Sequence, residues 1–458
     1  MNHCKSILVA LLLSILNHPS TLFAQGSLTP PGAPAPTMKS LDQIEPRIPI
    51  STLPFSISNG GSYYLTGSLT GGPGQDGITV TADNVTIDLN GFELAGVPAH
   101  SGIAGSGTHT NIVVRNGTIR DWSLGVSTLN TTGGRFERLQ FIRDTSGGLY
   151  VGDDSLILEC TVEKSPSSST IFGSITTGSA SVVRNCIVKN SASIGIQVGS
   201  YSSVSGCTVM VSAGVGISPN QGSIVSGCVV TSASGVAIYC SQNTSVLDCS
   251  VSGNQSSGII AGNGCTIRNC VADNNVGIGI GLFDASTIQN CAARQNGNGG
   301  ISLGTSSTIS DCITFSNTAN GIIAGTFTIV THCSSTGNSS NGIVTSDGCS
   351  IKDCTVNQNL ASGIRTTSNC LIAGNVASLN ATGLTNQANI YVTATDNQIM
   401  DNTVTGGGPG IKTTSGFNLI VKNKVTLSIP PFDLALNNKT GSITNDPTLA
   451  GPWANFNF

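Results

Sequence analysis

Charged residues are scarce in this chain of 458 residues. They make up 9% of it, and the formal net charge is −4. Residues 190–247 contain no Asp, Glu, Lys or Arg at all. Because the chain is weakly acidic and has no cluster of basic residues, we expect no nucleic-acid partner. A stretch without ionisable side chains cannot carry ordinary acid–base chemistry, so we expect any such chemistry elsewhere.

Cofactor and metal motifs are also missing. The sequence has no phosphate-binding glycine loop, no Cys-x-x-Cys pair and no calcium loop, so we expect neither a cofactor nor a metal. Aromatic residues amount to 5%, and only five histidines are present. Beyond the N-terminus, no segment is apolar and long enough to cross a bilayer, so no transmembrane segment is expected.

The N-terminus has the pattern of a secretory signal peptide over residues 1–24. Lys5 precedes an apolar run from Ile7 to Leu16, and Ala24 ends a plausible cleavage site. We therefore expect an exported, soluble protein that is secreted, periplasmic or at the cell surface. Residues 25–50 form a Pro-rich linker and an N-terminal cap, in which Ser40 and Gln43 suggest the first turn of a short capping helix.

What the sequence does contain is a strict repeat of 21 residues. The residues that share this spacing are cysteines: Cys186, Cys207, Cys228, Cys249, Cys270, Cys291, Cys312, Cys333 and Cys354. Apolar columns lie three residues before, two after and eleven before each cysteine, which predicts three short strands per coil. The expected fold is all-β, a right-handed parallel β-helix over residues 51–445, with roughly 16 coils. Residues 446–458 are expected to form a C-terminal tail or cap.

The columns between the strands are typical of turns. Asn, Gly or Asp usually precedes the cysteine, as at Asn185 and Asp248, where a bend with left-handed backbone is expected. Asparagines stand five residues after the cysteine, from Asn254 to Asn380, and could bond to one another between coils. Two breaks of the period, near Ser165–Ser167 and within Thr385–Ala394, indicate inserted loops.

Fourteen of the 15 cysteines follow the predicted signal peptide. Alternation places them on the inward face, and small buried thiols that fill a narrow core are the favoured interpretation. Export would also permit disulfides. Two pairs on adjacent strands of one coil, Cys265 with Cys270 and Cys349 with Cys354, are the hypothetical bridges.

At these residues the chain resembles the parallel β-helix repeat proteins of the pectate-lyase-like superfamily. The unit that carries the resemblance runs from Gly300-Ile301 through Ile309 and Cys312 to Asn317. The resemblance implies the fold, but its members include lyases, hydrolases, epimerases, tailspikes and adhesins. Their catalytic motifs are absent: there is no Gly-His-Gly and no Asp-Pro-His, and Asp153-Asp154 alone matches the polygalacturonase-like set.

Charge is concentrated in residues 115–164, where a site could still lie. Carboxylates can serve glycoside hydrolysis, arginine can bind uronate carboxylates, and aromatic rings can stack on sugars. The competing interpretation is a set of turn residues with no shared groove. The candidate substrate-binding residues are Asp121, Trp122, Arg138, Arg143, Asp144, Tyr150, Asp153 and Asp154.

The sequence therefore predicts an exported β-helix protein without a recognisable catalytic motif. Binding or structure outside the cell is the favoured role, with a polysaccharide as the possible partner. The alternative is a polysaccharide lyase or glycoside hydrolase that acts on an acidic polysaccharide. No catalytic residue can be assigned, and the pattern indicates no particular oligomeric state.

Overall fold

A computed structural model describes residues 46–163 and 173–458. Apart from Pro46, these residues form one compact unit, Arg47–Phe458. The predicted signal peptide, most of the linker with its capping helix, and the insertion near Ser165–Ser167 lie outside the described residues. None of the described helices is long and apolar enough to cross a membrane.

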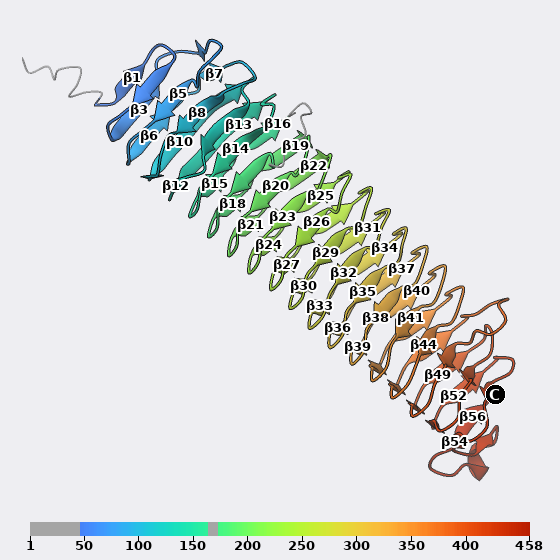
Figure 1. Ribbon diagram of the computed structural model, residues 1–458. Helices are drawn as coiled ribbons and strands as arrows, with labels where there is room; N and C mark the ends of the chain where they lie inside the picture. Colours follow the sequence, from blue (N-terminus) through green and yellow to red (C-terminus); the bar gives the residue numbers. More distant parts are fainter. Residues whose placement is uncertain (1–45, 164–172) are drawn as a thin grey trace, which may run out of the picture. The chain divides into compact units, whose positions relative to one another are not determined.

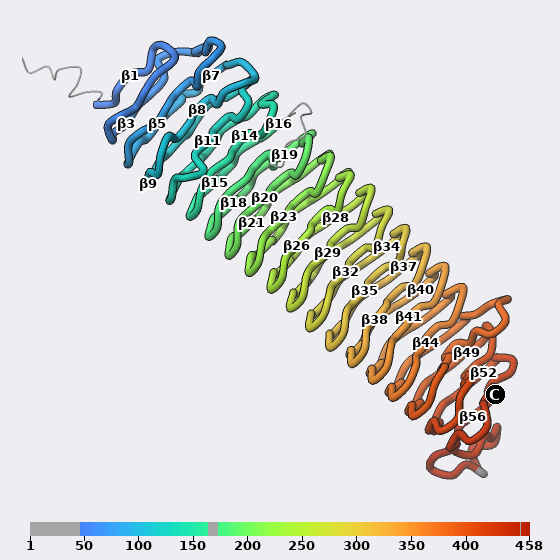
Figure 2. The backbone as a smooth tube through the Cα atoms, viewed as in Figure 1, coloured from blue at the N-terminus to red at the C-terminus, as the bar shows by residue number. Residues whose placement is uncertain are grey.

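The described residues fold as the predicted parallel β-helix (Figure 1). One coil consists of β24 (Ile224–Ser226), β25 (Val229–Thr231) and β26 (Ile238–Cys240), and each strand pairs in parallel with its counterpart one coil later. The register matches the repeat, with Val225 opposite Val246 and Ile238 opposite Ile259. Figure 2 shows the coils following one another in chain order. The only helix among the described residues is the 3-10 turn η1 (Pro447–Leu449).

Three ladders of strands run through the coils. We call them the first, second and third ladder, after the order of β24, β25 and β26 in their coil. In the early coils, β10 (Ile112–Arg120) and β13 (Arg135–Ile142) each extend through both the first and the second ladder. The third ladder runs from β2 (Phe55–Ile57) to β53 (Phe432–Leu434) and sets the number of coils at about 18. The expected 16 was too low because the first coils lack the cysteine column.

Three corners join the ladders, and the first corner is a bend of one residue. Asn185 and Asp248 have φ values of 54° and 55°, which confirms the predicted left-handed backbone. His332, with φ 53°, takes the same conformation without being Asn, Asp or Gly. The bend aims the following cysteine inward, where its thiol bonds to the carbonyl two residues before, at 3.3 Å from Cys228 Sγ to Ser226 O.

The second corner carries a ladder of buried asparagines, as predicted. Asn317 donates from Nδ2 to Asn338 Oδ1 at 2.9 Å, and its own Oδ1 accepts from Asn296 Nδ2 at 3.1 Å. The backbone N–H of Asn296 also donates to Asn317 Oδ1, at 2.9 Å. One side chain thus satisfies polar groups of two coils that would otherwise be buried without partners. The chain of side-chain bonds extends from Asn254 to Asn389.

Cysteines and apolar residues fill the interior. All fourteen cysteines of the described part are buried and free, so the hypothetical bridges Cys265–Cys270 and Cys349–Cys354 are not formed. Burial raises the pKa of the Cys240 thiol well above its usual value, which keeps it neutral. Near the C-terminus asparagine takes over the cysteine column, and Asn375, Asn402, Asn423 and Asn455 bond in series. The last of these lies in β56 (Asn455–Asn457), which pairs with β52 (Lys424–Thr426).

Candidate functional site

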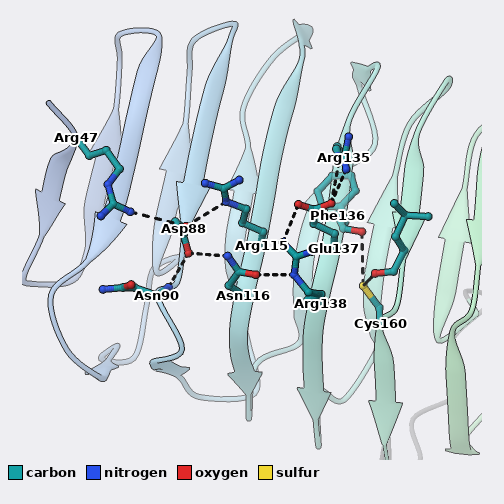
Figure 3. Close-up of polar contacts among 11 residues, drawn as sticks. Arg47, Asp88, Asn90, Arg115, Asn116, Arg135, Phe136, Glu137, Arg138 and Cys160 are labelled. Atoms are coloured by element: carbon teal, nitrogen blue, oxygen red, sulfur yellow. Dashed lines mark hydrogen bonds and ion pairs between the residues drawn. The ribbon is translucent and has the colours of Figure 1, made fainter. Parts of the chain in front are cut away.

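The charged residues of the early coils form ion pairs with one another. Asp88 lies between two arginines, at 3.1 Å from Arg115 Nε and 3.8 Å from Arg47 NH1 (Figure 3). Asn116 Nδ2 donates to the same carboxylate at 3.2 Å. These contacts link successive coils along the outer face of the first ladder, because Asp88 and Arg115 are register partners on adjacent strands.

Arg138 belongs to the same network and lies at the first corner. Its φ is 52°, its Nε donates to Asn116 Oδ1 at 2.8 Å, and its NH2 lies 3.2 Å from Glu137 Oε1 (Figure 3). Glu137 is buried, and its other oxygen lies 2.7 Å from Arg135 NH2. A shallow groove of about 470 Å³ borders Arg138 and Glu159, but no aromatic residue lines it.

Asp121 and Arg143 form a second network at the second corner. Two parallel bonds of 2.8 Å each join the Arg143 guanidinium to the Asp121 carboxylate. Arg120 contacts the same carboxylate and also Glu93, at 2.5 Å. Arg143, with help from Arg120, holds the pKa of Asp121 below its usual value. Both charges are therefore compensated within the fold.

Trp122 is a core residue. It is 0% exposed, and its Nε1 donates to Leu94 O at 3.0 Å. Glycines of earlier coils make room for the ring: a Cβ on Gly96 would lie 2.1 Å from it, and one on Gly77 2.9 Å. The expected sugar-stacking role for Trp122 does not fit this burial, because the ring presents no face to solvent.

Asp144 is buried directly behind Trp122. Its Oδ1 accepts the Trp122 backbone N–H at 2.9 Å, while its Oδ2 is buried without a hydrogen-bond partner. Desolvation raises the pKa of Asp144 well above its usual value. By register it occupies the column that carries the asparagine ladder in later coils, and its Oδ1 performs the same capping bond. Asp144 is thus buried, and its Oδ1 caps the backbone as the asparagines do in later coils.

Asp153, Asp154 and Tyr150 belong to the third corner and the third ladder. Asp153 Oδ1 accepts the backbone N–H of Ser179 at 2.7 Å, and Asp284 and Asp347 make the same bond to the following coil at 2.8 and 2.9 Å. Asp154 has φ 53° and forms the turn itself. Tyr150 is half-buried on the outer side of β14 (Gly147–Val151). Seven of the eight candidates therefore lie on three different corners and Tyr150 lies on the third ladder, and Arg138 alone among them lines the shallow groove.

A groove on the third ladder was missed by the sequence reasoning. It has a volume of about 390 Å³ and is lined mainly by amides, hydroxyls and one ring: Asn220, Gln221, Tyr239, Cys240, Ser241, Gln242 and Gly262. Tyr239 is 50% exposed. The groove lies in a part of the chain that is almost free of charge, and the sequence predicts no acid–base chemistry there. The sequence does contain one indication of this groove: Tyr239 occupies the outward position of an otherwise apolar strand.

A second groove lies near the C-terminus. It has a volume of about 550 Å³, and its lining includes Leu419, Lys439, Pro452 and Trp453. Trp453 is 60% exposed, and Lys422 Nζ lies 4.8 Å from its ring centroid. No cluster of three potential metal ligands occurs in the ranges that the structure covers.

Comparison with known proteins identifies the repeat. The family model described as "Right handed beta helix region" matches residues 124–266, 203–333 and 261–393, which together span more than half of the chain. A search of curated proteins finds no match.

Several solved structures resemble the chain. The A-module of mannuronan C-5 epimerase AlgE4 from Azotobacter vinelandii is 15% identical, with coverage of 83% of this chain and 90% of that one and a TM-score of 0.32. A mutant of the periplasmic alginate epimerase AlgG is 15% identical, with coverage of 72% and 77% and a TM-score of 0.33. Alginate lyase AlyF-OU02 is 13% identical, with coverage of 56% and 80% and a TM-score of 0.33.

Proposed function

The chain belongs to the right-handed beta-helix family, and from that premise we propose that it is an exported, non-catalytic protein that binds polysaccharide. The observation that carries the non-catalytic part is that the candidate carboxylates do not face one open site: Asp144, which lies near Asp121, is buried. Hydrolysis of a glycosidic bond requires two carboxyl groups on either side of one bond, about 5–10 Å apart. Asp121 and Asp153 lie on different corners, and each accepts hydrogen bonds from its own corner of the following coil, from Arg143 and from the Ser179 N–H respectively.

Aromatic side chains on the surface support the binding part. Most exposed positions of the coils are Ser, Thr, Asn or Gly, yet Tyr201, Tyr239 and Trp453 are 71%, 50% and 60% exposed. The fold of one coil requires no ring at the positions of Tyr201 and Tyr239, because the next coil has Gly222 and Ile260 there. Such rings combine a flat apolar face with a polar edge, which suits the C–H faces of sugars. Export remains part of the proposal and rests on the N-terminal sequence pattern.

The experiment compares turnover with retention. The purified mature chain is incubated with neutral and uronate-containing polysaccharides, with and without calcium, and unsaturated products and new reducing ends are measured. In parallel, its retention on each immobilised polysaccharide is recorded. We expect retention on at least one polymer and no product on any.

Three variants act as controls: Asp121→Ala, Asp144→Ala and Asp153→Ala. Each should leave retention unchanged. Product formation that disappears in one of these variants would instead make the protein a lyase or hydrolase. Absence of both product and retention would leave a structural or protein-binding role.

A further inference from the structure

Exposed aromatic residues recur on every second coil of the third ladder. Tyr201 follows β20 (Ile196–Val198), Tyr239 lies in β26, Phe283 follows β32 (Ile280–Leu282), and Phe327 follows β38 (Ile322–Ala324). They are 71%, 50%, 58% and 67% exposed. Figure 1 shows the four strands in order along the stack, and Tyr150 on β14 extends the series by one step. We call Tyr150, Tyr201, Tyr239, Phe283 and Phe327 the aromatic band.

Glycines of the next coil give two of the rings room. A Cβ on Gly222 would lie 2.7 Å from the Tyr201 ring, and one on Gly348 would lie 2.5 Å from the Phe327 ring. These two rings therefore extend along the stack over the glycine of the next coil, whereas Tyr239 lies opposite Ile260 of the next coil. Tyr150 and Tyr239 share a column of the third ladder, and Tyr201 and Phe327 share a column of the third corner, so the band zigzags between the ladder and the corner.

The surroundings of Tyr201 and Tyr239 are polar and uncharged. The amide-lined groove at Tyr239 contributes Asn220, Gln221 and Gln242. The chain has no charged side chain between Lys189 and Asp248. Asp284, beside Phe283, is engaged by the backbone N–H of Thr305 at 2.8 Å. A ligand with carboxylates would find no cation here, whereas the hydroxyl groups of a neutral sugar would find amide donors and acceptors.

Resting on the proposed function, we propose that the aromatic band binds a neutral polysaccharide that runs along the stack of coils. Strands of neighbouring coils are ~4.8 Å apart, so successive rings are separated by roughly 10 Å along the axis. Rings at this interval can each stack on one sugar unit of an extended chain, and the amides at Tyr239 fix its hydroxyl groups. Such binding is independent of salt and pH, because no charge takes part in it.

The test measures retention of the full mature chain on immobilised neutral polymers, namely cellulose, xylan, mannan and β-glucan, and on polygalacturonate and alginate. Tyr201→Ala and Tyr239→Ala should each weaken binding to a neutral polymer by roughly 3- to 10-fold, as expected for one stacked ring. The triple variant, which combines these two substitutions with Phe283→Ala, should no longer bind the neutral polymer. Trp453→Ala removes a ring of similar exposure outside the band and should change nothing.

The outcomes separate this site from the proposed function. If the wild type and the triple variant retain a neutral polymer equally and unfold at the same temperature, the aromatic band is not the binding site. The proposal that the protein binds polysaccharide would still stand. Retention only of polygalacturonate or alginate, lost in high salt and in Trp453→Ala, assigns binding to the C-terminal groove and also overturns the band. Retention of no polymer overturns both. Loss confined to the band variants, and insensitive to salt, confirms the site.

Discussion

The coils built from residues 85–163 and those built from residues 190–262 have the same three ladders but opposite surfaces. In the early coils, the ionisable side chains pair with one another, as Arg143 does with Asp121, and the tryptophan is buried. In the middle coils, charge is nearly absent and the rings of Tyr201 and Tyr239 are open to solvent. The comparison teaches that concentrated charge can be taken up by contacts between coils, while a stretch without charge can expose aromatic rings.

The largest effect is expected from Trp122→Ala. The substitution removes the largest fully buried side chain and leaves a cavity bordered by glycines that cannot fill it. The free energy of unfolding should fall by about 3–5 kcal/mol in denaturant titrations. Trp453→Ala, which removes a 60% exposed ring, is the matched control and should stay within about 0.5 kcal/mol of wild type. Equal stability of the two variants would contradict the assignment of Trp122 to the core.

The asparagine ladder of the middle coils should be nearly as sensitive. Asn317→Ala leaves the backbone N–H and Nδ2 of Asn296 without their acceptor in a buried place. Each unsatisfied group costs about 1–3 kcal/mol, so we expect a loss of about 2–4 kcal/mol. Thr355→Ala, on the outer face of β43 (Thr355–Asn357), is the control and should have little effect. If the asparagine ladder does not contribute to stability, the two variants will have the same unfolding midpoint.

Asp144 links the two regions because it is the carboxylate that stands in the asparagine column. Burial raises the pKa of Asp144 in the folded state above its value in the unfolded state. The protonated carboxyl therefore makes its full contribution to the free energy of unfolding below the ordinary Asp pKa, and this contribution is lost as the pH rises through the raised pKa. The facing charges, Asp121 and Arg143, do not cancel this burial cost. Asp144→Asn keeps the acceptor for the Trp122 N–H and cannot ionise.

We therefore expect Asp144→Asn to raise the free energy of unfolding at neutral pH by about 1–3 kcal/mol and to flatten its decline with pH. Unfolding curves recorded from pH 4 to pH 8 measure both effects. Asp153→Asn, at the exposed third corner, is the control. A parallel pH profile for wild type and Asp144→Asn would contradict the proposed burial of a titrating group.

A structural feature can be predicted from this sequence when its residues recur at the same position in successive coils. The strands, the left-handed bends and the asparagine ladder recur in identical columns, so one coil predicts the next. The burial of Trp122 depends on Gly77 and Gly96, which belong to earlier and irregular coils, and no column indicates this contact. The aromatic band escapes a column count for a related reason: its rings recur at an interval of two coils, but they are spread over more than one position within the coil, and small residues or Ile260 occupy the same positions in the coils between.

The smallest effect is expected from Arg143→Ala, although this residue belongs to the densest charge cluster of the chain. Its side chain is 46% exposed, and Arg120 still neutralises Asp121 when it is removed. Exposed pairs contribute little because water and salt screen them within a Debye length of about 8 Å at physiological ionic strength. The thermal midpoint at physiological salt and the retention on neutral polysaccharides should both match wild type, with a small shift of the midpoint only at low salt. A clear loss of retention in Arg143→Ala, at unchanged stability, would reverse the comparison, because binding would then belong to the charged coils and not to the uncharged ones.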